Sequence, residues 1–145
     1  MSATAQMLGN VILFADVPLD IREEMAQRGA TRQVPAGSSL VRQGDADSGM
    51  QMIVSGSADV VVNDFHVRTL GVGEYFGEIS LIDKRPRSAT IVAGPEGCHT
   101  FTVSPMVFWQ IVDAHPSMAR GVMKGLAQRL RGAEEALNEA RHSHD

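Results

Sequence analysis

The chain has 145 residues, of which 43% are hydrophobic and 21% charged, and its formal net charge is −4. This length and composition predict a single domain over residues 1–145 with its own hydrophobic core, and they exclude a disordered chain. The acidic balance argues against a nucleic-acid partner, because DNA and RNA are bound mainly through a basic face.

The sequence carries no sign of a membrane segment or a metal site. No apolar stretch approaches the roughly 20 residues that cross a bilayer, and residues 1–15 lack the basic start and cleavage site of a signal peptide. Cys98 is the only cysteine, which excludes an internal disulfide and a four-cysteine zinc site, and the five histidines show no ligand spacing. We therefore expect a cytoplasmic protein with no membrane span, no metal and no resident cofactor.

The N-terminal region reads as helical over residues 8–29. Leu13, Phe14 and Val17 precede Pro18, and apolar residues then recur near helical spacing until Gly29, which is expected to end the helix.

Residues 30–103 change to short β-type runs separated by Gly, Pro, Asn and Asp turns. This pattern predicts an α+β fold, in which an eight-stranded antiparallel β-roll (jelly roll) lies between N-terminal helices and two C-terminal helices. Seven of these strands can be placed on the sequence, at Thr31–Val34, Ser39–Val41, Gln51–Val54, Ala58–Val62, Val67–Leu70, Ala89–Ala93 and His99–Val103.

The two C-terminal helices are expected over residues 104–140. Ser104 is the predicted N-cap of the first, with Pro105 at its first position, and Pro116 opens the second. Apolar residues in the second helix recur at heptad spacing, which allows two interpretations: the stripe pairs with a second copy in a homodimer, or it covers the β-roll of its own chain. The stripe consists of Ala119, Met123, Leu126, Leu130, Ala133, Leu137 and Ala140.

One segment, residues 73–90, does not fit a plain β-roll, because a glycine precedes a single predicted helical turn. The free N–H groups of such a turn, from Gly77 to Leu81, can receive a phosphate. Arg87 can pair bidentately with phosphate oxygens, and Glu78 has acceptor oxygens suited to a sugar hydroxyl. The segment therefore predicts a site for a sugar phosphate.

Residues 76–90, which read Phe-Gly-Glu-Ile-Ser-Leu and then Pro-Arg-Ser-Ala-Thr, resemble the phosphate-binding cassette of the cyclic-nucleotide-binding domain family. That family includes the regulatory subunits of cyclic-AMP-dependent kinase, bacterial catabolite activators and cyclic-nucleotide-gated channels. The glycine-marked strands around Gly37, Arg42–Asp45 and Gly56 also look like this family, and the resemblance covers about residues 11–131. The name cassette is used below for residues 76–90.

The resemblance implies that Glu78 binds the ribose 2′-hydroxyl and that Arg87 binds the cyclic phosphate of a 3′,5′-cyclic mononucleotide. Serine at position 88 implies weak discrimination between bases, with cyclic AMP favoured and cyclic GMP tolerated. The ligand-binding residues expected from the cassette are Phe76, Gly77, Glu78, Ile79, Ser80, Arg87, Ser88, Ala89 and Thr90.

In the family the last helix closes over the base as a lid, and its movement signals to an effector protein, here unidentified. Residues 116–145 contain no Phe, Trp or Tyr, so the expected lid contacts are aliphatic or cationic. The lid candidates are Met123, Leu126, Arg129 and Leu130.

No nucleophile and base are placed for catalysis, so we expect a sensor rather than an enzyme. The alternative is a degenerate module of the same fold that serves as a protein-interaction platform without binding nucleotide. Multidomain members of the family add further domains or membrane spans, and none is recognisable in these 145 residues, so we expect a free-standing sensor or a module excised from a longer protein.

Overall fold

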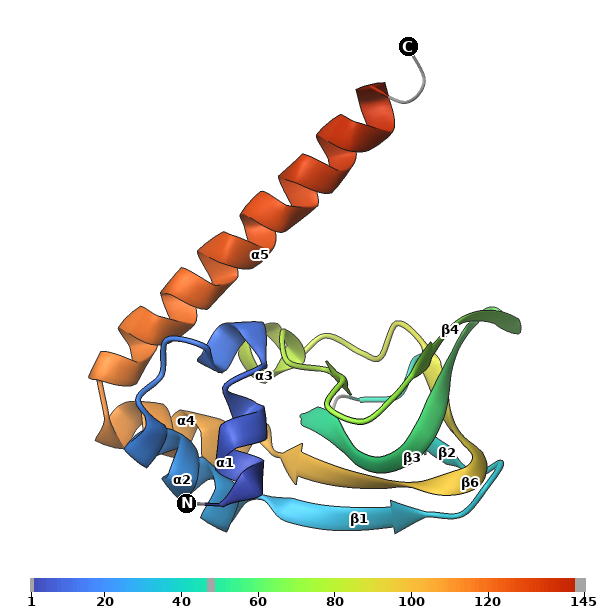
Figure 1. Cartoon of the computed structure of the whole chain (residues 1–145), viewed down its shortest axis with the longest axis horizontal. Coiled ribbons are helices and arrows are strands. Elements are labelled where there is room, and N and C mark those ends of the chain that lie inside the picture. Colours follow the sequence, from blue (N-terminus) through green and yellow to red (C-terminus); the bar gives the residue numbers. More distant parts are fainter. Residues whose placement is uncertain (1, 47–48, 143–145) are drawn as a thin grey trace.

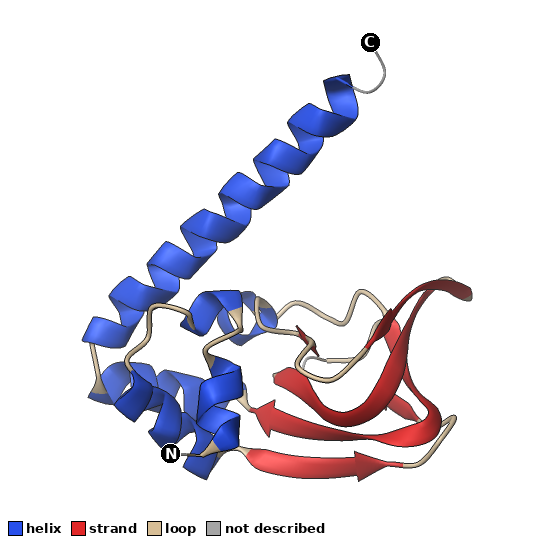
Figure 2. Cartoon of the chain, in the orientation of Figure 1, coloured by secondary structure: helices blue, strands red, loops and turns tan. Residues whose placement is uncertain are grey.

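The computed structural model describes residues 2–46 and 49–142, and the helices gather at one end of a β-roll (Figures 1 and 2). The N-terminal part forms α1 (Ala3–Leu8), the short 3-10 helix η1 (Ile12–Phe14) and α2 (Leu19–Arg28). Helical structure thus begins before the predicted residue 8. The reason is Ser2, whose hydroxyl accepts a hydrogen bond from the N–H of Ala5 at 3.0 Å and caps α1.

The strands are β1 (Ala30–Val34), β2 (Ser39–Val41), β3 (Met50–Val62), β4 (Phe65–Leu70), β5 (Tyr75–Phe76) and β6 (Thr90–Val103). All pairings are antiparallel. The central order is β1-β6-β3-β4, with β2 also paired to β6 and β5 to β3. The predicted antiparallel β-roll is confirmed.

The predicted count of eight strands is wrong for the described residues, which form six. Ser55-Gly56 and Gly94-Pro95 lie in gaps between candidate strands, where the sequence favours turns. In the structure both pairs lie inside the long strands β3 and β6. At the first of these points the β3–β6 register shifts, and Gly56 takes a φ of 78°. Glycine there permits an irregularity within the strand instead of ending it.

The interior has two apolar clusters, one beneath the helices and one inside the roll. The helical cluster includes Phe14, Met25, Met52, Phe108 and Met118. The roll cluster lies directly behind the cassette, because Phe76 belongs to it together with Val34, Leu40, Ile53, Val60, Leu70 and Ile91. Packing of Phe76 against this second cluster fixes where the cassette leaves the sheet.

The C-terminal helices are α4 (Pro105–Ala114) and α5 (Ser117–His142), and the hydroxyl of Ser104 caps α4 by accepting from the N–H of Val107 at 3.1 Å. The start of α5 packs on η1: a side chain at Gly125 would meet the backbone of Ile12. Beyond this contact α5 projects away from the body of the molecule (Figure 1).

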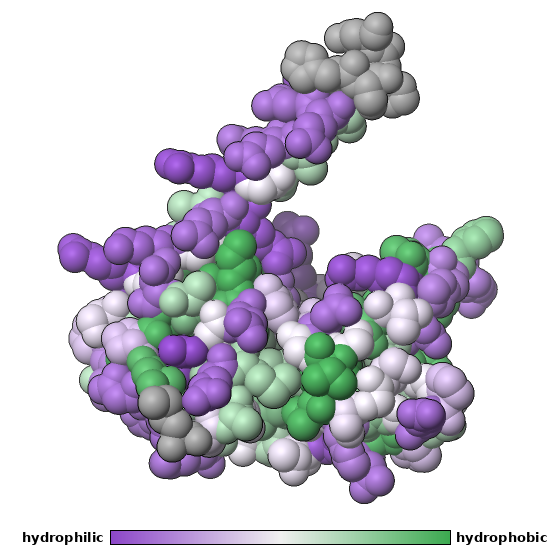
Figure 3. All heavy atoms as spheres, viewed as in Figure 1, coloured by the Kyte–Doolittle hydropathy of each residue, from purple (hydrophilic) through white to green (hydrophobic). Residues whose placement is uncertain are grey.

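The apolar stripe of α5 does not cover the β-roll of its own chain, so that interpretation is wrong. Met123, Leu130 and Leu137 are 61%, 61% and 54% exposed. Figure 3 shows hydrophobic patches along the otherwise hydrophilic projecting helix. The helix leaves the body because the η1 contact holds only its first turns.

Candidate functional site

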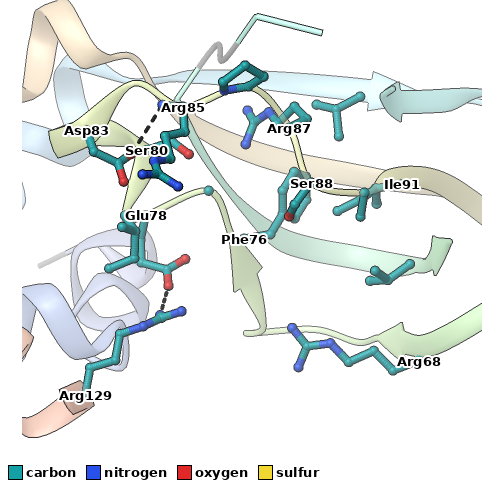
Figure 4. Close-up of a pocket in the computed structure, with 16 residues that line it drawn as sticks. Arg68, Phe76, Glu78, Ser80, Asp83, Arg85, Arg87, Ser88, Ile91 and Arg129 are labelled. Carbon is teal, nitrogen blue, oxygen red and sulfur yellow. Dashed lines mark hydrogen bonds and ion pairs between the residues drawn. The ribbon is translucent and has the colours of Figure 1, made fainter. Parts of the chain in front are cut away.

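A cavity of about 330 Å³ opens between the cassette, the roll and α5 (Figure 4). Its wall combines apolar residues of the strands with polar side chains from the cassette, from β4 and from α5. The cassette itself leaves β5, forms one helical turn, α3 (Ser80–Asp83), and returns through an extended segment to β6. The predicted turn after the glycine is therefore confirmed.

Gly77 makes the sharp bend between β5 and this turn, with a φ of 80°. A Cβ at this position would lie 2.6 Å from the carbonyl oxygen of Gly49 and would also overlap the guanidinium of Arg87. Glycine is required here for two reasons, the left-handed backbone and the close approach of a charged side chain.

Arg87 lies inside the wall of the cavity and is only 7% exposed. Its Nη2 donates to the carbonyl of Gly49 at 2.6 Å, and its guanidinium lies 5.6 Å from the centre of the Phe76 ring. Its backbone is held on both sides, by the carbonyl of Asp45 at 2.9 Å and by the N–H of Gly44 at 2.8 Å. The chain thus fixes a buried cation in place before any ligand arrives.

Glu78 follows the bend and is 5% exposed. Its carboxylate accepts a hydrogen bond from Nη1 of Arg129, which reaches it from α5 (Figure 4). The first hydrogen bond of the turn is donated by the N–H of Leu81, at 3.3 Å from the carbonyl of Glu78. The N–H groups that precede it therefore have no acceptor within the turn, which suits an anion.

The cavity brings together the predicted cassette residues with the exception of Thr90. The hydroxyl of Thr90 instead accepts from the backbone N–H of Gln43 at 2.9 Å, and Thr90 lines a separate hollow with Asn63 and Asp64. This bond ties the start of β6 to the loop after β2.

Of the four lid candidates, Arg129 alone lines this cavity. Met123 and Leu126 line a different, apolar cavity against Phe108 and Trp109, and Leu130 is exposed. In this conformation α5 therefore meets the site through one charged side chain and not through an aliphatic cover.

Sequence reasoning missed residues that reach the cavity from distant strands. Arg68 on β4 points into it (Figure 4), and Val41, Val60 and Ile91 complete the apolar wall. The sequence does contain a pattern that indicates Arg68. This residue lies two positions before buried Leu70 and so shares the inward face of the strand. Asp83 and Arg85, within the cassette, also line the cavity.

Three further features bear on function: the single cysteine, the candidates for a metal site and the candidates for a membrane span. Burial raises the pKa of the Cys98 thiol, which lies on β6 outside this cavity. Within residues 2–46 and 49–142, no group of three His, Cys, Asp or Glu side chains is placed to hold a metal ion. None of the described helices combines the length and apolar character needed to span a bilayer.

Comparison with known proteins assigns the class. Residues 31–115 match the model of the cyclic nucleotide-binding domain family. The chain belongs to this family, and the matched range contains the whole cassette and the strands that form the cavity wall.

Similar proteins include an effector protein, a channel and the N-terminal domain of a transcriptional regulator. The chain is 31% identical to the Pycsar effector protein PaPycTIR of Pseudomonas aeruginosa over 86% of its length, and 32% identical to a cyclic nucleotide-gated potassium channel of Rhizobium etli over 88%. It spans only 40% and 35% of those two proteins. The N-terminal domain of a transcriptional regulator from Streptomyces coelicolor A3(2) shares the fold, with a TM-score of 0.81 at 22% identity, covering 90% of this chain and 96% of that one.

Proposed function

We propose that the chain is a non-catalytic sensor that binds one 3′,5′-cyclic mononucleotide in the cassette cavity. The observation that carries this proposal is the pair of oppositely charged, buried side chains, Arg87 and Glu78, on one cavity wall. A ligand that satisfies both must have an anionic group and a hydroxyl donor a short distance apart. A ribose cyclic phosphate has both.

The division of roles follows from charge. A carboxylate repels phosphate, so the phosphate belongs with Arg87 and the free N–H groups after Gly77, and the ribose 2′-hydroxyl belongs with Glu78. Membership of the family supports this assignment, as does the name of the Rhizobium relative, a channel gated by cyclic nucleotides. A cytoplasmic location stays a prediction from the sequence.

For the base we propose weak discrimination, with cyclic AMP favoured and cyclic GMP tolerated. The hydroxyl of Ser88 can donate or accept, and Arg68 can donate to a purine ring nitrogen or to a carbonyl. We expect cyclic AMP to bind no more than about tenfold more tightly than cyclic GMP, equivalent to about 1.4 kcal/mol. Side-by-side calorimetric titrations check this, and a thousandfold difference would show that the proposed base contacts are wrong.

A protein-interaction platform without nucleotide binding is the alternative, and a melting experiment separates the two functions. A ligand present at about 100 times its Kd stabilises the folded state by about 2.7 kcal/mol, so cyclic AMP or cyclic GMP at that excess should raise the Tm clearly. The non-cyclic 5′-monophosphates serve as controls. An unchanged Tm with every cyclic nucleotide would favour the platform.

We propose that α5 moves as a lid when nucleotide binds and that this movement signals to an effector protein. The exposed stripe of Met123, Leu130 and Leu137 offers a second function for the same helix, pairing with another copy in a homodimer. The lid requires amides from about Met118 to Leu130 to gain hydrogen-exchange protection when nucleotide is added at constant oligomeric state. Identical exchange in both states would refute the lid and leave the stripe as a dimer contact.

A further inference from the structure

The carboxylate of Glu78 already has a partner in the structure, the guanidinium of Arg129. The two members of this ion pair differ in their surroundings, because the Glu78 side chain is 7% exposed and that of Arg129 is 49% exposed. A buried carboxylate depends on a donor, whereas a half-exposed guanidinium can return to water at little cost.

We infer that Arg129 competes with the ligand ribose for Glu78, so that this arginine weakens nucleotide binding and lessens the preference of the site for ribose over 2′-deoxyribose. The inference rests on the proposed function. A cyclic nucleotide offers Glu78 its 2′-hydroxyl from the same cavity that Arg129 lines, and in this competition the carboxylate exchanges a charged donor for a neutral one. The free energy lost with the ion pair opposes binding, so the affinity for the ligand falls.

A 2′-deoxy nucleotide reveals the competition, because it has no donor for Glu78. In the native chain Arg129 can stay on the carboxylate, so the missing hydroxyl leaves no buried charge without a partner. Without Arg129 the same ligand leaves Glu78 with no donor from either side. Removal of the arginine should therefore help the ribose ligand and give the deoxyribose ligand no benefit.

The test is calorimetric titration of cyclic AMP and 2′-deoxy cyclic AMP, with cyclic GMP and its 2′-deoxy analogue in parallel, into the wild-type chain and Arg129→Met. Methionine keeps an apolar stem and removes the donors. Arg131→Met is the matched control, since it removes the same charge two residues further along α5 from an exposed side chain that does not line the cavity. Melting curves establish that each variant is folded, and Arg129→Gln is a second variant.

We expect Arg129→Met to bind cyclic AMP about tenfold more tightly than the wild type, to bind the 2′-deoxy analogue no better, and so to raise the ribose preference at least tenfold. Arg131→Met should match the wild type. Weaker or unchanged binding of cyclic AMP by folded Arg129→Met and Arg129→Gln would overturn the competition and leave the proposed function intact. No binding of any cyclic nucleotide by any of these proteins would overturn the proposed function and this inference together.

Discussion

Arg87→Ala is expected to weaken cyclic nucleotide binding at least a hundredfold. The guanidinium of Arg87 is buried, the backbone of this residue is fixed on both sides, and Nη2 is held by the carbonyl of Gly49. We therefore expect the guanidinium to meet the phosphate without reorganisation. Alanine removes a charge-assisted bidentate pair and leaves the phosphate facing a neutral wall. A hundredfold corresponds to about 2.8 kcal/mol, within the range for contacts to charged groups.

Arg85→Ala is the matched control for this prediction. Arg85 lines the same cavity and carries the same charge, but its side chain is exposed, so water screens its attraction for phosphate. Its removal should change the affinity only a few fold. Calorimetry that found the two variants equally affected, or Arg87→Ala unaffected while folded, would remove Arg87 from the phosphate site.

Gly77→Ala is expected to abolish most binding and to lower the stability of the fold. Alanine in the left-handed region costs about 1–2 kcal/mol. At this position the new Cβ would also overlap the Arg87 guanidinium and the Gly49 carbonyl, so the side chain proposed to bind phosphate must move. We expect a lower Tm and a loss of affinity of at least tenfold.

Gly73→Ala separates the cost of the left-handed backbone from the effect of the steric overlap. Gly73 has a similar φ of 87°, but no atom lies within 4 Å of a Cβ built there. It should lose stability by the backbone cost alone and keep its affinity. If both variants lost the same stability and the same affinity, the close approach of Arg87 to Gly77 would have no role in the site.

The fold could be predicted from the sequence as far as local patterns determine it. The cap at Ser104 and the single turn after Gly77 depend on neighbouring residues, and both were predicted correctly. The strand count failed because Ser55-Gly56 has the composition of a turn, whereas its β6 partner across the sheet keeps it in a strand. The course of α5 was also beyond local reasoning, since it depends on the contact of Gly125 with η1.

Prediction of the site had the same limit: residues within one segment could be predicted, whereas residues from distant elements could not. Glu78 and Arg87 lie nine residues apart in one segment, so their types and spacing alone predicted a shared ligand. Arg68 and Arg129 reach the cavity from β4 and α5, and only the packing of these elements brings them there. Sequence reasoning placed Arg129 near the base, whereas in the structure its guanidinium contacts the carboxylate expected to bind ribose.

The most direct test of the central claim is a crystal structure of the chain with cyclic AMP. The account predicts one nucleotide in the cassette cavity, with its cyclic phosphate bound by Arg87 and the N–H groups after Gly77, and with its 2′-hydroxyl donating to Glu78. A nucleotide bound elsewhere on the chain, or one in this cavity with its phosphate away from Arg87, would contradict it.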